Sequence, residues 1–154
     1  MDWKALEFFV GKWQGTGSGQ PGTGDYERSY EFILNQKFLF VKNQSIYPPQ
    51  ERNPQGETHQ DWGIISLDKG RDTFVYRQFH KEGFVNQYML ERISPDNKEF
   101  SFISESIENI PSGWRARESY RILSPDEFIE TFELAEPGKE FELYTQCHLK
   151  KCNP

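Results

Sequence analysis

One short stretch near the N-terminus constrains the fold more than any other part of the chain. Glycine occupies positions 11, 15, 17 and 19, and Trp13 fills the remaining odd position. Alternate residues of a β-strand share one face, so the stretch predicts a first strand with one large anchor and a bare face beyond it. Glycines at such a place let a strand bend, as barrel closure requires. We therefore expect Trp13 to plug one end of a β-barrel, with Gly11, Gly15 and Gly17 shaping its first strand.

The remaining sequence keeps a period of two, interrupted by turns that contain Gly, Pro, Asp or Asn. Further strands are expected over residues 29–34, 37–47, 57–67, 73–79, 84–93, 99–107, 114–123, 127–135 and 141–150. Residues 2–10 instead read as a short helix that Asp2 can cap. A length of 154 residues with no linker predicts one domain over residues 1–154. Because consecutive turns are short, strands that follow each other in the chain are expected to be neighbours in the sheet. The fold is expected to be all-β, an up-and-down antiparallel barrel of about ten strands with a short N-terminal helix.

Charge and hydropathy exclude several kinds of partner. The net charge is −6, with Lys and Arg spread along the chain, which disfavours nucleic acid or an anionic membrane as the main partner. No apolar run is long enough to insert into a membrane as a helix, and the N-terminus lacks the features of a secretion signal. Cys147 and Cys152 are therefore expected to be free thiols of a cytoplasmic protein.

Several stretches resemble a known group of barrels. A short helix followed by Gly-x-Trp resembles the calycin superfamily, which includes lipocalins and fatty-acid-binding proteins. The longer stretch 11–21, with its alternating glycines and Pro21, resembles the opening of the nitrobindin-like haem-binding β-barrels and related uncharacterised bacterial barrels. Residues 38–41 (FLFV), 59–64 (HQDWGI) and 117–122 (RESYRI) follow in the order of that family's strands. The resemblance implies a calycin-like barrel that binds a small molecule.

The resemblance also implies a set of ligand-binding residues. The family holds haem iron through a His in the last strand, and Tyr144 occupies that position here, counted back from residues 149–151. Tyr can ligate ferric haem, so Tyr144 is the metal ligand if haem binds, and haem is a doubtful cofactor. His59 matches a distal-side His of the family. The ligand-binding candidates are His59, Trp62, Arg117, Tyr120 and Tyr144.

The last strand can be read in two registers, and the sequence leaves both open. The family alignment places Tyr144 inside the barrel, together with Gln146 and His148. The apolar alternation instead places Phe141, Leu143, Cys147 and Leu149 inside.

Histidines and carboxylates outside that set have simpler structural interpretations. The three histidines match no metal-ligand spacing, so a zinc site is not predicted. His80 and His148 are expected at the surface. The strand carboxylates, which include Glu118 and Glu130, could supply an acid and a base, but they are expected to alternate with apolar residues and face water.

Three arginines on one strand face, Arg115, Arg117 and Arg121, could grip a carboxylate or phosphate. Pairing with acidic residues of the strand at 127–133 is the favoured alternative. The calycin resemblance further implies a late cation over the Gly-x-Trp indole, a structural role for Arg121 or Lys150.

Together these features favour a binding protein that holds a small hydrophobic or amphipathic ligand in an apolar cavity with few polar groups. Two alternatives stay open. The resemblance implies a haem barrel with nitric-oxide or peroxynitrite chemistry, whereas a solidly packed interior would indicate a ligand-free structural or interaction barrel. No nucleophile elbow is present, so a binding role is favoured over an enzymatic one. The sequence does not decide whether the barrel forms a homodimer.

Overall fold

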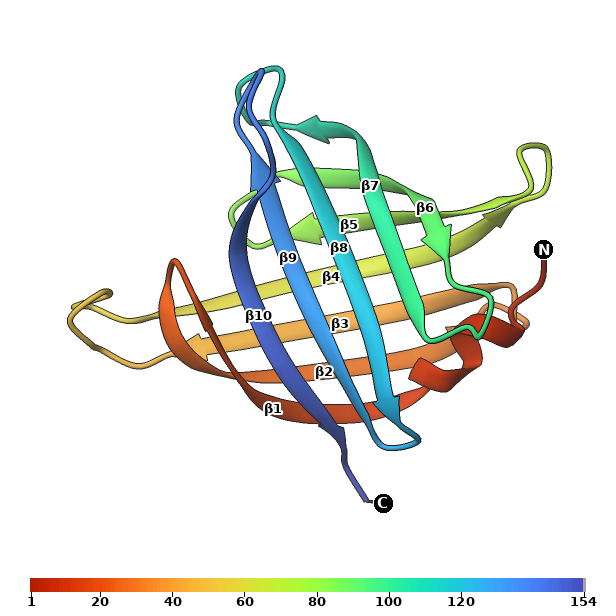
Figure 1. Cartoon of the computed structure of the whole chain (residues 1–154), viewed down its shortest axis with the longest axis horizontal. Coiled ribbons are helices and arrows are strands. Elements are labelled where there is room, and N and C mark those ends of the chain that lie inside the picture. The colour runs from red at the N-terminus through yellow and green to blue at the C-terminus, as the bar shows by residue number, and fades with distance from the viewer. Residues whose placement is uncertain (154) are drawn as a thin grey trace.

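Ten antiparallel strands form a closed barrel in the computed structural model, which describes residues 1–153 (Figure 1). The strands are β1 Gly11–Gly19, β2 Gly22–Ile33, β3 Phe38–Tyr47, β4 Glu57–Asp68, β5 Thr73–His80, β6 Val85–Ile93, β7 Glu99–Glu108, β8 Arg115–Ser124, β9 Glu127–Ala135 and β10 Glu142–Lys151. Each strand pairs with the next along the chain, and β10 pairs with β1. The predicted up-and-down barrel is therefore confirmed. Among the described residues, no helix has the length and apolar character needed to cross a membrane.

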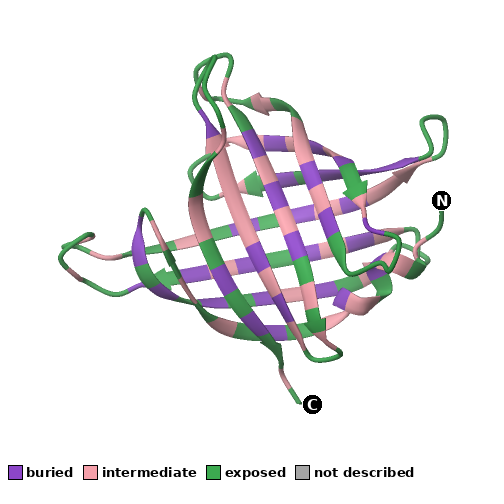
Figure 2. Cartoon of the chain, in the orientation of Figure 1, coloured by how far each residue is buried: buried purple, intermediate pink, exposed green. Residues whose placement is uncertain are grey.

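Alternation of buried and exposed residues explains why these segments are strands (Figure 2). Along β2, residues 22, 24, 26, 28 and 30 are buried, while residues 23, 25 and 27 between them are exposed. The sequence predicts β2 only from residue 29, because Gly22 and Gly24 are typical of a turn. A β-carbon on Gly24 would lie 2.6 Å from the Ile46 carbonyl oxygen, and Gly22 has a φ of +107°, so both positions favour glycine.

A short 3₁₀ helix, η1 (Lys4–Phe9), closes one end of the barrel. Leu6 and Phe9 are buried in the barrel core, and the Trp13 indole Nε1 donates a hydrogen bond of 2.8 Å to the Phe9 carbonyl. Phe128 packs against the Trp13 ring at a centroid distance of 4.8 Å. These contacts join the helix to the start of β1 and to β9, so this end of the barrel is filled by aromatic side chains.

The cation over the Trp13 indole is Lys151, whose Nζ lies 5.5 Å from the ring centroid. The sequence assigns this role to Arg121 or Lys150. The β1–β10 register pairs Trp13 with Lys151 and places Lys150 beside Gln14, which explains the difference of one residue. Arg121 is exposed on β8.

Candidate functional site at the barrel mouth

The half of the barrel next to η1 has no room for a guest. Its largest side chains are less than 2 % exposed, so almost none of their surface can touch even a water molecule; they include Trp13, Phe74, Tyr76, Tyr88, Phe102 and Phe128. The opposite end, here called the mouth, is ringed by the turns that follow β1, β3, β5, β7 and β9. A molecule bound inside the barrel must therefore lie toward the mouth.

Between the packed end and the mouth, charged and amide side chains line the interior. Arg28, Asp61, Gln78, Glu118 and Glu130 are each less than 10 % exposed. This belt corrects the expectation of an apolar interior with few polar groups.

The expectation that Glu118 and Glu130 face water is wrong for a definable reason. Glu118 lies between Ala116 and Tyr120 on the inward face of β8, and Glu130 follows Phe128 on the inward face of β9. The carboxylates therefore share a face with the apolar residues instead of alternating with them.

Glu130 has close partners, whereas Glu118 does not. The Arg28 guanidinium binds the Glu130 carboxylate at 2.8 Å through both Nε and Nη2, and the free thiol of Cys147 donates to it at 3.3 Å. The Glu118 Oε2 atom is buried with no hydrogen-bond partner within residues 1–153. Burial raises the pKa of Glu118 well above its usual range, and repulsion by Glu130 and Asp61 adds to this effect, with Arg28 opposing it.

Glu118→Gln should stabilise the fold by about 1–3 kcal/mol at neutral and alkaline pH. Because the folded-state pKa of Glu118 is raised, its contribution to stability is fully present below the unfolded pKa of about 4.3 and is lost as pH rises toward the folded pKa. Glutamine cannot ionise and removes that loss. Urea unfolding measured between pH 5 and pH 9 should therefore give a free energy of unfolding that falls less steeply with rising pH in the variant than in the wild type. Glu108→Gln, an exposed control, should follow the wild type; equal profiles for all three proteins would contradict the burial argument.

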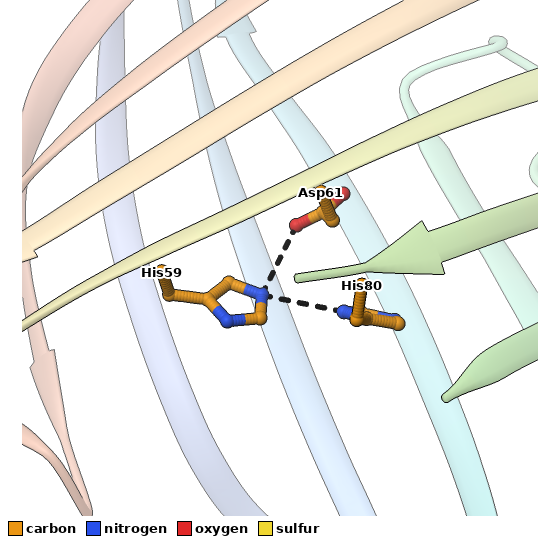
Figure 3. Close-up of side chains that lie close together, drawn as sticks. All are labelled: His59, Asp61 and His80. Atoms are coloured by element: carbon orange, nitrogen blue, oxygen red, sulfur yellow. Dashed lines mark hydrogen bonds and ion pairs between the residues drawn. The ribbon is translucent and has the colours of Figure 1, made fainter. Parts of the chain in front are cut away.

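Three side chains with metal-binding or acid–base chemistry converge at the mouth (Figure 3). His59 and Asp61 lie two residues apart on β4, so they share its inward face, and Asp61 pairs in register with His80 at the end of β5. His59 Nε2 lies 3.3 Å from Asp61 Oδ2 and 3.3 Å from His80 Nδ1. Here we call His59, Asp61 and His80 the mouth cluster.

Each member of the mouth cluster is held by a further contact. Glu82, in the β5–β6 turn, lies 2.8 Å from His59 Nδ1. Asp61 Oδ1 accepts hydrogen bonds from Asn43 Nδ2 at 2.8 Å and from Gln78 Nε2 at 2.7 Å. The ring of Phe84 stacks on His80 with a centroid distance of 4.0 Å.

These surroundings set the charge of the mouth cluster. Burial lowers the pKa of His80 to about 4, assisted by the neighbouring His59, so His80 is neutral at pH 7. Burial opposes the charge on His59 and on Asp61 as well. Their mutual hydrogen bond and other polar contacts outweigh it, so the pKa of His59 is raised and that of Asp61 is lowered.

Tyr144 also lies toward the mouth. The β9–β10 register shifts between Leu143 and Thr145, so Tyr144 sits in a β-bulge. Its ring packs edge-on against Phe132 at 5.7 Å. Tyr144 lines a pocket of about 210 Å³ together with Gln20, Trp114, Leu134, Glu136, Lys139, Glu140, Glu142 and Leu143.

The other predicted ligand-binding residues lie elsewhere. Tyr120 is buried at the packed end, against Phe9. Trp62 is 58 % exposed on the outer wall. Arg117 is also on the outer wall and binds Glu91 at 3.0 Å and, at 3.9 Å, Glu133 on β9. The structure therefore brings only His59 and Tyr144 of the five to the mouth.

In the last strand each register proposed from the sequence holds in part. Cys147 and Leu149 are buried, as the apolar alternation predicts. Leu143, by contrast, is 51 % exposed because the bulge at Tyr144 reverses the alternation. Gln146 and His148 are exposed, and His148 pairs with Glu127 at 2.7 Å.

Asp61, His80 and Glu82 are the residues that sequence reasoning missed, with His80 interpreted as solvated. The strand register, which can be counted from the sequence, indicates that Asp61 and His80 lie close together. Counting back along both strands from the turn at residues 68–73 places Asp61 opposite His80. His59 then falls on the same face by the period of two.

Comparison with known proteins shows the fold. No protein-family model matches the chain, and no curated protein matches it in sequence. The crystal structure of Rv2717c from M. tuberculosis is similar with a TM-score of 0.73 and 17% identity, over 98% of this chain and 97% of that one. The structure of EF1p2_mFAP2b bound to DFHBI is similar with a TM-score of 0.50 and 11% identity, over 97% and 98%.

Proposed function

We propose that this barrel is a relative of the nitrobindin-like barrels and binds a small amphipathic molecule at its mouth. The observation that carries the proposal is the pairing of an aromatic and aliphatic wall with polar groups in one place. Leu134 and Tyr144 supply apolar surface in the pocket, and Gln20 and Lys139 line the same pocket with hydrogen-bonding and charged groups. Sites for small molecules combine these two features.

The depth of the barrel restricts what can bind. Because the end near η1 is packed and the middle carries the polar belt, a long hydrocarbon chain has no apolar tunnel to enter. A compact ligand fits the mouth better, with its apolar part against Tyr144 and its polar part toward the rim. The similarity to Rv2717c over nearly the whole chain supports the barrel fold on which this proposal rests.

Haem, which the family resemblance implies, does not fit these residues. Burial raises the pKa of Tyr144, and the carboxylates of Glu57 and Glu82 raise it further, which disfavours the phenolate that would bind ferric iron. The pocket of about 210 Å³ lies below the range of about 300–1,000 Å³ typical of sites for drug-sized molecules, so it has room for a compact ligand but not for haem. His59 does not line this pocket, and its Nε2 faces Asp61 and His80 instead. The proposed binding function therefore does not include haem.

Binding can be followed through Trp114, which lines the pocket. Titration with short-chain fatty acids, aromatic carboxylates and the dye DFHBI should change tryptophan fluorescence and raise the melting temperature for at least one class. Tyr144→Ala should weaken that binding about tenfold, the effect of losing about 1.4 kcal/mol of contact.

Phe79→Ala is the matched control, since Phe79 is an aromatic residue 52 % exposed on the outer wall. It should bind like the wild type. A panel without any fluorescence or melting response, or an equal loss in both variants, would contradict binding at the mouth.

A further inference from the structure

The mouth cluster has the composition and spacing of a metal site. Two imidazoles and one carboxylate each offer one ligand atom, and the three atoms lie within 4.8 Å of one another (Figure 3). We propose that His59, Asp61 and His80 bind a divalent transition-metal ion, and that Zn²⁺ suits this ligand set. This inference is independent of the small-molecule function proposed above.

Distances within the cluster agree with tetrahedral coordination. Bonds of about 2.0–2.1 Å to nitrogen and oxygen place neighbouring ligand atoms of a tetrahedron about 3.3–3.4 Å apart. His59 Nε2 lies at 3.3 Å from both Asp61 Oδ2 and His80 Nδ1. Two edges of the tetrahedron are therefore already formed by the protein.

Hydrogen bonding alone leaves this arrangement incompletely satisfied. His59 Nε2 can carry one hydrogen, yet it faces both a carboxylate oxygen and an imidazole nitrogen. A proton placed there serves one of the two contacts, whereas a cation among the three atoms serves all of them. Only oxygen and nitrogen lone pairs are needed for metal ligation, and each of the three side chains has one available.

Outer contacts hold the ligands as they are held in metal proteins. Glu82 lies 2.8 Å from His59 Nδ1, which fixes that ring with Nε2 toward the cluster. Asn43 and Gln78 both donate to Asp61 Oδ1 and leave Oδ2 for the metal. Stacking on Phe84 orients the His80 ring. Such outer partners are typical of metal-binding histidines and carboxylates.

Burial and access favour a bound ion. Asp61 is 6 % exposed, so its negative charge lies in a medium of low polarity that strengthens attraction to a cation. The His59 side chain is 25 % exposed, which gives an entry path from the mouth. Three protein ligands leave a fourth position for water, the pattern of zinc sites that keep an open coordination position.

The test is titration of the metal-free full chain with Zn²⁺ by calorimetry, and with Co²⁺ by visible absorption. One equivalent should bind, the melting temperature should rise with Zn²⁺, and the Co²⁺ spectrum should show intense tetrahedral bands without thiolate charge transfer. His59→Ala and Asp61→Asn should each weaken Zn²⁺ binding at least 100-fold, and Glu82→Gln should weaken it about 10–100-fold.

Two control variants address the other residues that could bind zinc. His148→Ala removes an exposed histidine beside Glu127, and Cys152→Ser removes a half-buried thiol. Both should bind Zn²⁺ like the wild type. Chemical shifts of the His59 and His80 ring nitrogens in the wild-type protein give a reading that needs no variant, and both should move on addition of Zn²⁺.

Three results would overturn the proposal: no binding of Zn²⁺ or Co²⁺ by the wild type, equal affinity in His59→Ala, or ring shifts confined to His148. Because Tyr144 is not a ligand, Tyr144→Ala should keep its zinc affinity even where it loses small-molecule binding. The metal site and the small-molecule site can therefore fail separately.

Discussion

Arg28→Met should lower the free energy of unfolding by about 3–5 kcal/mol, the cost of removing one partner from a buried ion pair. Arg28 and Glu130 are 8 % and 7 % exposed at their side chains and lie 2.8 Å apart. Methionine leaves the Glu130 carboxylate inside the barrel with only the Cys147 thiol, a weak donor, as partner. Arg28 also donates to the Glu27 and Gln44 carbonyls, and those contacts are lost as well. Urea unfolding followed by circular dichroism measures the change.

A matched surface pair separates burial from charge. Arg92 and Glu99 are joined at 3.1 Å with side chains 67 % and 50 % exposed, so Arg92→Met should cost less than about 1 kcal/mol. The double variant Arg28→Met/Glu130→Leu should regain part of the stability, because no charge is then left unpaired. Equal losses in Arg28→Met and Arg92→Met would refute the role given to burial.

The barrel was predictable from local patterns because each strand carries its own evidence. The sequence predicts both bounds of strand β9 correctly, since apolar alternation over residues 127–135 is flanked by turns containing Pro. The sequence pattern starts strand β2 seven residues too late, because its first half is built from glycines and charged residues whose inward face is visible only beside β1 and β3. Residues 22–28 form a strand because they pair with β1 and β3 in the closed barrel, and their residue types alone do not indicate this.

The mouth cluster was harder to predict because its members meet across strands. His59 was singled out, but its partner His80 is 21 residues away and meets it only through the β4–β5 register. The buried charged residues were hard to predict for the same reason, since their partners also lie on other strands. Glu118 and Glu130 look like solvated strand residues until the inward face is assigned, and Arg28, which neutralises Glu130, is 102 residues distant from it in sequence.

Gly15→Ala should destabilise the barrel by about 3 kcal/mol, the upper end of the usual cost of overpacking. A β-carbon at Gly15 would overlap the His148 carbonyl oxygen, and it would lie 2.8 Å from the carbonyl carbon and 3.0 Å from the Leu149 Cα. These are all backbone atoms of β10, so no side-chain rotation relieves the contact. The strands β1 and β10 must move apart, and that pair is the seam that closes the barrel.

Hydrogen exchange locates this effect. Amides that pair β1 with β10, such as those near Gly17 and Cys147, should exchange faster in Gly15→Ala, while those between β3 and β4 should keep their relative protection. Gly70→Ala is the control, because a β-carbon there meets only Asp68 Oδ1 at 3.4 Å, an ordinary contact. That variant should unfold within about 0.5 kcal/mol of the wild type. If Gly15→Ala matched Gly70→Ala in stability and seam exchange, the seam would not require a bare first strand. The alternating glycines, the strongest sign of a barrel in the sequence, would then have another cause.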